Sequence, residues 1–255
     1  MELLIPGTTL ALSPYRANLR IENGRVISDR KKVAIAAFAQ TASTTVLLAE
    51  DPTWEIWCLN NGYELPHYYD AEGRFRADRH FEMHPVNVQP ANDLNWMHAC
   101  PVPIYVLRVA DPVPGGYAPM AVQYPLAEME RAFPMPAPFW ASTFAYQMAL
   151  AMSEGFTEIA LLGMDFGTPR EWLFERPNLL FWAGVARGRG IRLIWPGEST
   201  LFRHVGRYGY DYQKEVDWCR EGVDYLFDAW GYDERPEAKA KRLRIEAMIQ
   251  EAIVK

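Results

Sequence analysis

The sequence predicts an α/β fold: a Rossmann-like parallel sheet flanked by helices, with an N-terminal β-hairpin and a C-terminal helical extension. Near-continuous apolar runs, typical of strands buried on both faces, recur along the chain. In the second half, helical segments alternate with these runs at the spacing of βαβ units, which favours right-handed crossovers. Near the N-terminus, Asn23-Gly24 stands between LRIE and RVIS and predicts a type I′ hairpin at an edge of the sheet.

Six segments have the apolar character of strands in a parallel sheet. They are KKVAIAAFA (31–39), WEIWCLN (54–60), HFEMHP (80–85), PIYVLRV (103–109), TEIALLGMDF (157–166) and IRLIWP (191–196). QTASTTVLLAED, which begins directly after the first run, predicts a loop and a short helix. Residues 139–156 predict a longer helix with Ser142 or Thr143 as N-cap and Gly155 as C-cap. Residues 176–190 predict a further helix with proline in its first turn.

Two parts of the chain lie outside this alternating pattern. Residues 110–138 are rich in proline, so we expect neither a regular helix nor a central strand there, but a functional loop or a surface excursion. Residues 210–255 predict amphipathic helices, which either pack on the domain or form a contact between two copies of the chain. We therefore expect a single domain, with the hairpin and sheet in 1–209 and the helical extension in 210–255.

Composition limits the classes of partner. The net charge of −6 argues against duplex nucleic acid, which needs a basic face. The three cysteines form no CxxC motif, so we expect neither a disulfide framework nor a zinc ribbon, and a cytoplasmic location. The N-terminus lacks the features of a signal peptide, and no apolar run reaches the roughly 18 residues that a membrane helix requires.

Ligands of open α/β sheets bind beyond the carboxyl ends of the strands, at a switch in strand order. The residues that follow the predicted strands, or begin the long helix, are therefore the candidates for a binding site. They are Gln40, Thr41, Ser43 and Thr44; Asn60, Asn61 and Tyr63; His84 and Asn87; Ser142 and Thr143; Asp165 and Phe166; and Glu198, Ser199 and Thr200.

These candidates are mostly neutral hydrogen-bonding groups. Amides recognise base edges and ribose hydroxyls, and hydroxyls at a helix N-terminus suit a phosphate, so the set favours a nucleotide or sugar ligand. No GxSxG, Walker A or HExxH motif is present. Each residue also has a structural interpretation. Ser142, Thr143 and Asp165 are suited to capping, Asn60 and Asn61 to a turn, and His84 to an exposed position.

His80, Glu82 and His84 alternate along one predicted strand and would share a face, as metal ligands can. No further carboxylate or histidine is brought near them by the predicted order of strands. We therefore predict no metal site here.

Two parts of the sequence resemble a known group of enzymes. AFAQTAS (37–43) followed by EIWCLNNGY (55–63), and FWASTFAYQMALAMSEGFTEIALLGMDF (139–166), resemble Rossmann-like bacterial glycosyltransferases of the sialyltransferase type and the related MptE-like pyrophosphokinases. The arrangement also resembles uncharacterised bacteriophage proteins. The resemblance implies a pocket for a CMP-sugar or another nucleotide. Asn60 and the loop of Gln40, Thr41 and Ser43 would contact the nucleotide, and Ser142 and Thr143 would lie by its phosphate or sugar. Asn61 and Phe166 are further candidates for nucleotide binding because they also follow predicted strands.

The sequence departs from that group at two positions. The first loop of the group is usually Gly-x-Gly-Pro-Ser, whereas AFAQTAS contains no glycine. The group also carries a catalytic histidine before the last strand, and here no histidine occurs from 167 to 190; His204 follows the last strand instead.

Three hypotheses follow. The first is a nucleotide-sugar-dependent, glycosyltransferase-like enzyme with His204 or His84 as general base and a nucleotide or nucleotide-sugar donor. The second is a Mg²⁺-dependent pyrophosphokinase or nucleotidyltransferase with Asp165 as a metal ligand. The third is a nucleotide-binding protein, such as a phage protein, without catalytic activity. A small molecule, rather than a membrane or duplex nucleic acid, is the expected partner in each.

Overall fold

The computed structural model describes residues 19–201, apart from 50, 71, 114, 115, 117, 167, 169 and 170, and also residues 202, 207 and 210. His204 and the predicted helices of 210–255, except Tyr210, lie outside the described residues. The chain divides into two compact units, one of residues 1–165 with 177–201 and one of 166–176 with 202–255. The predicted domain organisation, with the sheet in 1–209 and the helical extension in 210–255, stays a prediction.

Seven parallel strands form the main sheet, which confirms the predicted α/β class. Their order is β7-β6-β5-β4-β3-β8-β9, so the chain builds outward from β3 on one side and then returns to add β8 and β9 on the other. This reversal creates a switch point between β3 and β8. The strands are β3 (Lys32–Ala36), β4 (Trp54–Leu59), β5 (Arg79–Glu82), β6 (Ile104–Val106), β7 (Ala121–Gln123), β8 (Glu158–Leu162) and β9 (Arg192–Ile194).

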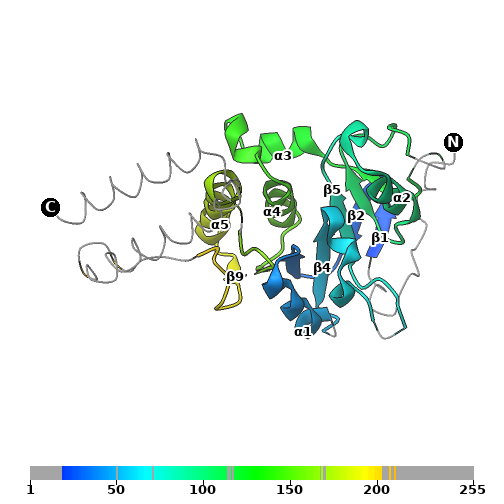
Figure 1. Ribbon diagram of the computed structural model, residues 1–255. Coiled ribbons are helices and arrows are strands. Elements are labelled where there is room, and N and C mark those ends of the chain that lie inside the picture. Colours follow the sequence, from blue (N-terminus) through cyan, green and yellow to red (C-terminus); the bar gives the residue numbers. More distant parts are fainter. Residues whose placement is uncertain are drawn as a thin grey trace, which may run out of the picture. The chain divides into compact units, whose positions relative to one another are not determined.

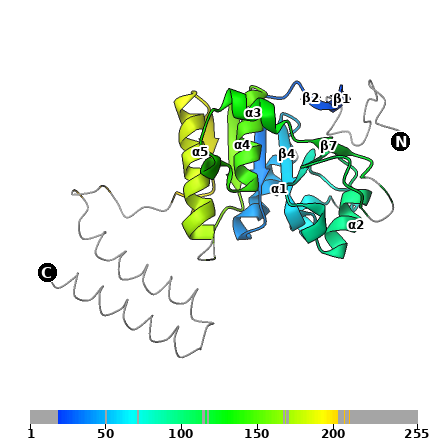
Figure 2. The same ribbon diagram turned by 90° about the horizontal axis from the view of Figure 1, so that it is seen from above.

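Helices cover both faces of this sheet. With right-handed crossovers, the reversal at β3 puts α1 and α2 on one face and α3, α4 and α5 on the other. Figures 1 and 2 show α4 and α5 side by side. The helices are α1 (Thr45–Ala49), α2 (Ala91–Ala99), α3 (Leu126–Ala132), α4 (Thr143–Ser153) and α5 (Arg176–Gly188). Shorter helical turns are η2 (Gln40–Thr44), η3 (Asn60–Glu64), η4 (Pro66–Tyr68), η5 (Val86–Val88), η6 (Ala137–Trp140) and η7 (Glu171–Glu175).

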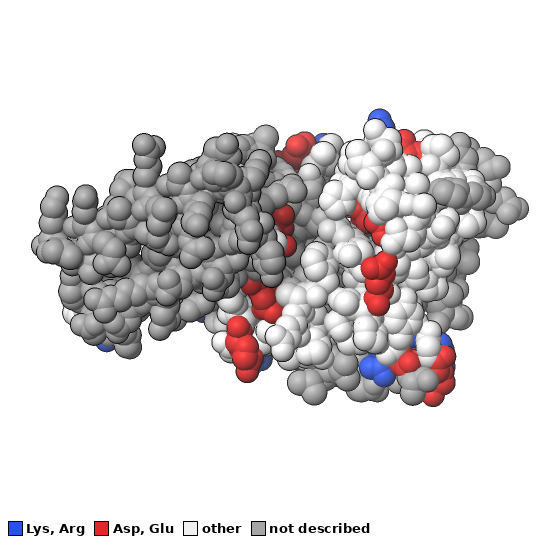
Figure 3. Space-filling model, in the orientation of Figure 1, with Lys and Arg blue, Asp and Glu red and all other residues white. Residues whose placement is uncertain are grey.

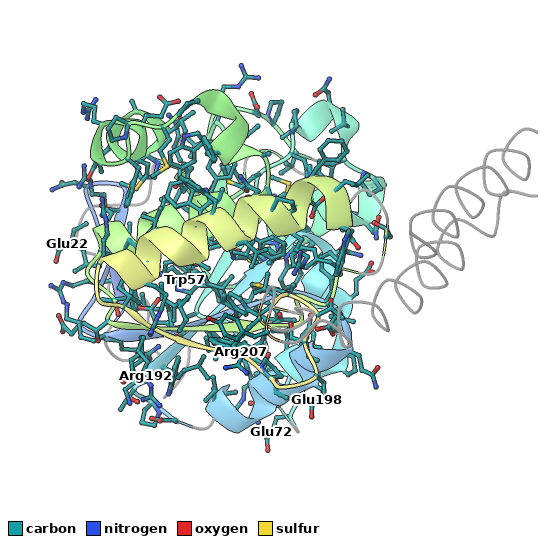
Figure 4. All side chains as sticks on the ribbon, turned by 90° about the vertical axis from the view of Figure 1, so that its left-hand side faces the viewer. Glu22, Trp57, Glu72, Arg192, Glu198 and Arg207 are labelled. Carbon is teal, nitrogen blue, oxygen red and sulfur yellow. The ribbon has the colours of Figure 1, made fainter. Side chains whose placement is uncertain are left out.

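Alternation along the strands gives the sheet two different buried faces. Trp54, Ile56 and Cys58 of β4 belong to an apolar cluster with Tyr68 and Met97. The intervening residues of β4 point to the opposite face, where Trp57 is completely buried. Figure 4 shows Trp57 among the packed side chains in the middle of the molecule, whereas Glu22, Glu72 and Glu198 lie at its periphery.

A buried ion network lies on the Trp57 face, near the amino ends of β4 and β5. Arg79 Nε donates to Glu55 Oε2 at 2.8 Å and Arg79 Nη1 donates to Glu154 Oε1 at 2.8 Å. Arg79 and Glu55 are both fully buried. Burial raises the pKa of Glu55, but the charge and hydrogen bonds of Arg79 outweigh it and hold that pKa below its usual value. The network ties β4 and β5 to the C-terminal end of α4.

The predicted hairpin is present but does not extend the main sheet. β1 (Leu19–Glu22) and β2 (Arg25–Ser28) pair antiparallel, and the turn residues Asn23 and Gly24 have φ values of 51° and 73°, as type I′ requires. β1 and β2 form a two-stranded sheet of their own, and the expected position at an edge of the main sheet stays a prediction.

The expectation for residues 110–138 is also partly wrong, since β7 and α3 lie there. β7 is an edge strand, which agrees with the exclusion of a central strand. The prolines of this segment do not prevent α3, because Pro125 stands immediately before its first residue. A missing N–H at that position removes no helical hydrogen bond. α2 was not predicted, since its sequence ANDLNWMHA has little apolar periodicity.

The surface agrees with the acidic composition. On the face that Figure 3 shows, carboxylates of the described residues form several patches, and basic side chains are sparse and lie toward its rim. Within the described part of the chain, no helix has both the length and the apolar character that crossing a membrane would need.

Candidate functional site

The carboxyl edge of the sheet collects most of the predicted site residues. Because all seven strands are parallel, their carboxyl ends lie at one edge, and the residues after β3, β4, β5 and β8 become neighbours there. α4 runs back from this edge, so its first residues lie at the same end. The predicted residues found at this edge are Gln40, Thr41, Ser43, Asn60, Asn61, His84, Ser142, Thr143 and Asp165.

Thr41 and Asp165 close the switch point between β3 and β8. The Thr41 backbone N–H donates to Asp165 Oδ2 at 3.0 Å, and Thr41 Oγ1 donates to Asp165 Oδ1 at 2.7 Å. The backbone N–H of Gly163 donates to Thr41 Oγ1 at 3.1 Å. Both carboxylate oxygens of Asp165 therefore hold the loop after β3 against the end of β8.

A glycine permits this close approach, but it does not lie in the first loop. Gly163 follows β8 with a φ of 69°, a conformation that favours glycine. A Cβ atom built there would lie 2.6 Å from the Ala42 Cβ, which is closer than real Cβ atoms approach, and 3.0 Å from the Ala37 carbonyl carbon, which is a tight contact. The loop after β3, which contains no glycine, can therefore pack closely against the end of β8, because Gly163 has no side chain there.

Asn60 and Thr143 meet at the end of β4. Asn60 has a φ of 45°, which costs about 1–2 kcal/mol for a residue with a Cβ and is tolerated best by Asn and Asp. Thr143 Oγ1 donates to Asn60 Oδ1 at 3.5 Å, a long and weak contact. The amide of Asn60 therefore lies at the carboxyl edge beside the first residue of α4, which keeps Asn60 a candidate for ligand contact.

Ser142 is the N-cap residue of α4, as predicted, but its hydroxyl does not cap the helix. Ser142 Oγ donates instead to Asn178 Oδ1 of α5 at 2.8 Å. At the other end of α4, Gly155 has a φ of 78°, which confirms the predicted glycine cap.

Glu82 and His84 form a close pair beyond β5. His84 Nδ1 lies 2.6 Å from Glu82 Oε1, and Gln89 Nε2 donates to the same oxygen at 2.8 Å. The Glu82 side chain is 2% exposed, whereas that of His84 is 52% exposed. A buried carboxylate thus holds one nitrogen of an imidazole that reaches the surface.

His80 does not join this pair. It lies among the rings of Tyr63 and Trp96, with centroid distances of 6.2 and 5.9 Å. Burial lowers the pKa of His80 to about 3, although the nearby Asn60 backbone favours protonation slightly, so the ring is neutral. Among the described residues, neither ring nitrogen has a hydrogen-bond partner. In the described part of the chain, no three His, Cys, Asp or Glu residues are grouped to hold a metal ion.

The remaining predicted residues differ in what the structure says of them. Gln40 and Asn61 are exposed, and Ser43 Oγ donates to the Gln40 carbonyl at 3.0 Å within η2. Phe166 has a φ of 29°, unusual for a bulky residue, and belongs to the second unit. His204 lies outside the described residues.

Sequence reasoning missed three residues at this edge. Gln89 and Asn178 are the partners of Glu82 and Ser142, and neither spacing nor residue type indicated them. Gln147 is fully buried one turn after Thr143; its Nε2 donates to the Cys58 carbonyl at 3.5 Å and its Oε1 has no partner among the described residues. Gln147 could have been noticed in the sequence, because it is a glutamine among the mostly apolar residues of the predicted helix FWASTFAYQMALAMSEGF.

Together, these groups can bind a polar organic ligand and move a proton. Asn60, Thr143 and the η2 loop offer amide and hydroxyl groups, and His84 offers an imidazole that a carboxylate orients.

No protein-family model matches this chain, and no curated protein matches it. Among solved structures, an α-2,3-sialyltransferase from Campylobacter jejuni in apo form has a TM-score of 0.41 at 13% identity, covering 71% of this chain and 82% of its own. The sialyltransferase CstII from the same organism, in complex with CMP-3FNeuAc, has a TM-score of 0.39 at 15% identity, covering 67% and 83%. CstII in complex with cytidine-5′-monophosphate has a TM-score of 0.37 at 16% identity, covering 67% and 82%. These are distant similarities, and no function is assigned from them.

Proposed function

We propose that this protein is a nucleotide-sugar-dependent, glycosyltransferase-like enzyme that binds its donor at the carboxyl edge of the sheet. One observation carries the proposal: Thr143 contacts Asn60 at the end of β4, and β4 is paired with β5, the strand that ends at the Glu82–His84 pair. Hydrogen-bonding groups for a nucleotide and a base for an acceptor hydroxyl then lie at the ends of two neighbouring strands.

Each part of the site has a role in this proposal. Asn60 and the η2 loop residues Gln40, Thr41 and Ser43 contact the nucleotide, and Thr143 lies by its phosphate or sugar. His84 accepts the proton of the attacking hydroxyl. Of the two histidines predicted as bases, His84 has the support of an observed carboxylate partner. The resemblance of residues 37–43, 55–63 and 139–166 to sialyltransferase-type enzymes makes cytosine the first base to test.

The first experiment is a thermal-shift screen against CMP, UDP, GDP, ADP and TDP, each with and without Mg²⁺. A ligand at 100 times its dissociation constant stabilises the folded state by about 2.7 kcal/mol, which raises Tm by about 5–10 °C. Asn60→Gly is the matched variant, because glycine adopts the φ of 45° without strain and removes only the amide. We expect a shift with one nucleotide that does not need Mg²⁺ and that Asn60→Gly reduces.

The other hypotheses have their own outcomes. A shift that requires Mg²⁺ and is lost in Asp165→Asn would favour the pyrophosphokinase or nucleotidyltransferase. Tight binding of a nucleotide sugar without hydrolysis or transfer would favour a non-catalytic nucleotide-binding protein. If no nucleotide changes Tm, the proposed function is wrong.

A further inference from the structure

We propose that Glu82 is a positioning residue, which holds the His84 imidazole in one tautomer and one orientation so that Nε2 serves as the base. The inference rests on the proposed function and adds to it a residue that acts through the base. Glu82 touches no substrate in this proposal; its effect passes entirely through His84 Nδ1.

The contacts of Glu82 give it one defined geometry. Glu82 Oε1 lies 2.6 Å from His84 Nδ1, within hydrogen-bond reach, and also accepts from the His84 backbone N–H at 3.3 Å and from Gln89 Nε2 at 2.8 Å. Glu82 ends β5 and is 2% exposed, so its carboxylate has little freedom to move. A carboxylate only accepts hydrogen bonds, so the neutral imidazole must carry its proton on Nδ1. Nε2 is then the basic nitrogen.

The position of the pair in the sheet puts it at the end of the strand next to the one that leads into Asn60. β4 and β5 are paired with Leu59 opposite Phe81, so the next residues of the two strands are Asn60 and Glu82. Neighbouring strands lie about 4.8 Å apart, and His84 follows two residues later. The base is therefore one strand away from Asn60, on the side of β4 opposite to the switch point.

The step that His84 would catalyse balances without a further reactant. The acceptor hydroxyl, or water in donor hydrolysis, gives its proton to Nε2, and its oxygen forms a bond to the anomeric carbon. The bond from that carbon to the phosphate oxygen breaks, and the nucleotide leaves with the electron pair. Imidazolium forms in this step, and the Glu82 carboxylate is placed to stabilise its positive charge.

The test is a measurement of the His84 tautomer by ¹⁵N NMR, using the full chain at a pH where the ring is neutral. The chain has five histidines, so His84→Ala is enough to assign the signal. We expect the wild type to carry the proton on Nδ1. We expect Glu82→Gln, whose amide oxygen can still accept, to retain much of that state, and Glu82→Leu to shift toward the Nε2–H form. Glu158→Gln makes the same chemical change at the start of β8, where Glu158 pairs with Arg192, and should leave the spectrum unchanged.

Kinetics with the nucleotide sugar found by the screen give the second measurement. We expect Glu82→Gln to lower kcat about 10- to 100-fold with little change in KM, and His84→Ala to lower it about 100- to 10,000-fold. Thermal unfolding of each variant checks its folding, and Glu82→Gln keeps the test decisive if Glu82→Leu does not fold.

The outcomes separate this inference from the proposed function. An Nε2–H tautomer in the wild type, or a kcat that Glu82→Gln leaves unchanged, would overturn the inference while donor turnover still supports the proposed function. If no nucleotide or donor binds, the proposed function fails and the inference fails with it, whatever the tautomer.

Discussion

A hydrogen bond joins Thr41 and Asp165, which are 124 residues apart in the sequence. This hydrogen bond occupies both side chains at the switch point between β3 and β8. Thr41 Oγ1 both donates to Asp165 and accepts from the Gly163 backbone N–H. A hydroxyl is the smallest side-chain group that can do both. The position therefore needs a hydroxyl, whatever the ligand is.

Thr41→Val should destabilise the protein by about 2 kcal/mol, because it keeps the shape of threonine and leaves a carboxylate oxygen and a backbone N–H without their partner. Thr41→Ser retains the hydroxyl and should stay within about 1 kcal/mol of the wild type. Urea unfolding of the three proteins measures the difference. Equal stability of the valine and serine variants would show that the Thr41 hydrogen bonds contribute nothing.

His80 predicts how stability depends on pH. Its pKa is about 3 in the folded protein and about 6.5 in an unfolded chain, so the folded pKa is depressed. A depressed pKa contributes stability that is present above the unfolded value and is lost as pH falls from about 6.5 toward 3. The loss approaches about 1.4 kcal/mol per pH unit.

His80→Leu should remove that slope while filling much of the same space between Tyr63 and Trp96. The free energy of unfolding, measured in urea at several pH values between 7.5 and 5, should fall more steeply in the wild type than in the variant by about 1 kcal/mol per unit below pH 6. Parallel curves for the two proteins would mean that His80 is not held neutral.

At the scale of elements, the contact between η2 and the end of β8 depends on Gly163. An added methyl group there would strain a φ of 69° and overlap Ala42 and Ala37, whose backbone carries the loop. Gly163→Ala should cost about 2–4 kcal/mol, of which about 1–2 comes from φ and the rest from overpacking. It should also weaken nucleotide binding, because η2 must move.

Gly155→Ala is the matched control for this prediction. Gly155 has a similar φ of 78°, but its added Cβ would meet only the end of the Lys31 side chain, at 3.9 Å. The control should therefore show the φ cost alone and leave nucleotide affinity unchanged. Equal effects of the two substitutions, on urea unfolding and on binding, would show that close approach at Gly163 does not matter.

The strands and turns that the sequence predicted well are those whose structure follows from the local pattern of residues. β3, β4 and β8 are near-continuous apolar runs, and the hairpin turn needs Asn23-Gly24, so local pattern sufficed. α2, α3 and β7 are short and have weak patterns, and packing on the sheet decides their structure.

For the candidate site, too, one part could be predicted from the sequence and another could not. Its position followed from parallel strands ending at one edge, which is why Asn60, His84 and Asp165 could be chosen from sequence. The pairing of Thr41 with Asp165 and of Ser142 with Asn178 could not, because it depends on contacts between distant segments. The sequence analysis named Glu82 only as one of three residues on a strand face that could resemble metal ligands. Its contact with His84 could not be predicted, because that contact depends on how the backbone turns after β5.

At the scale of the whole sheet, its two edges carry different chemistry. The amino edge holds the ion network of Arg79, Glu55 and Glu154, in which Arg79 and Glu55 pair out of contact with water and the Glu154 side chain is 23% exposed. The carboxyl edge holds neutral hydrogen-bonding groups and the Glu82–His84 pair. We therefore expect the Arg79 network to contribute to stability and not to ligand affinity, and the Asn60 amide to contribute to ligand affinity more than to stability.

Arg79→Met and Asn60→Gly test this division, with urea unfolding and calorimetric nucleotide binding measured on both. Arg79→Met leaves Glu55 buried without its cation and should cost about 3–5 kcal/mol of stability, while the remaining folded protein binds nucleotide with its affinity nearly unchanged. Asn60→Gly should change stability by less than about 1 kcal/mol and weaken binding about 10-fold, the loss of one or two hydrogen bonds. If Arg79→Met weakened binding as much as Asn60→Gly, the two edges would be coupled through β4, and the buried network would belong to the binding machinery.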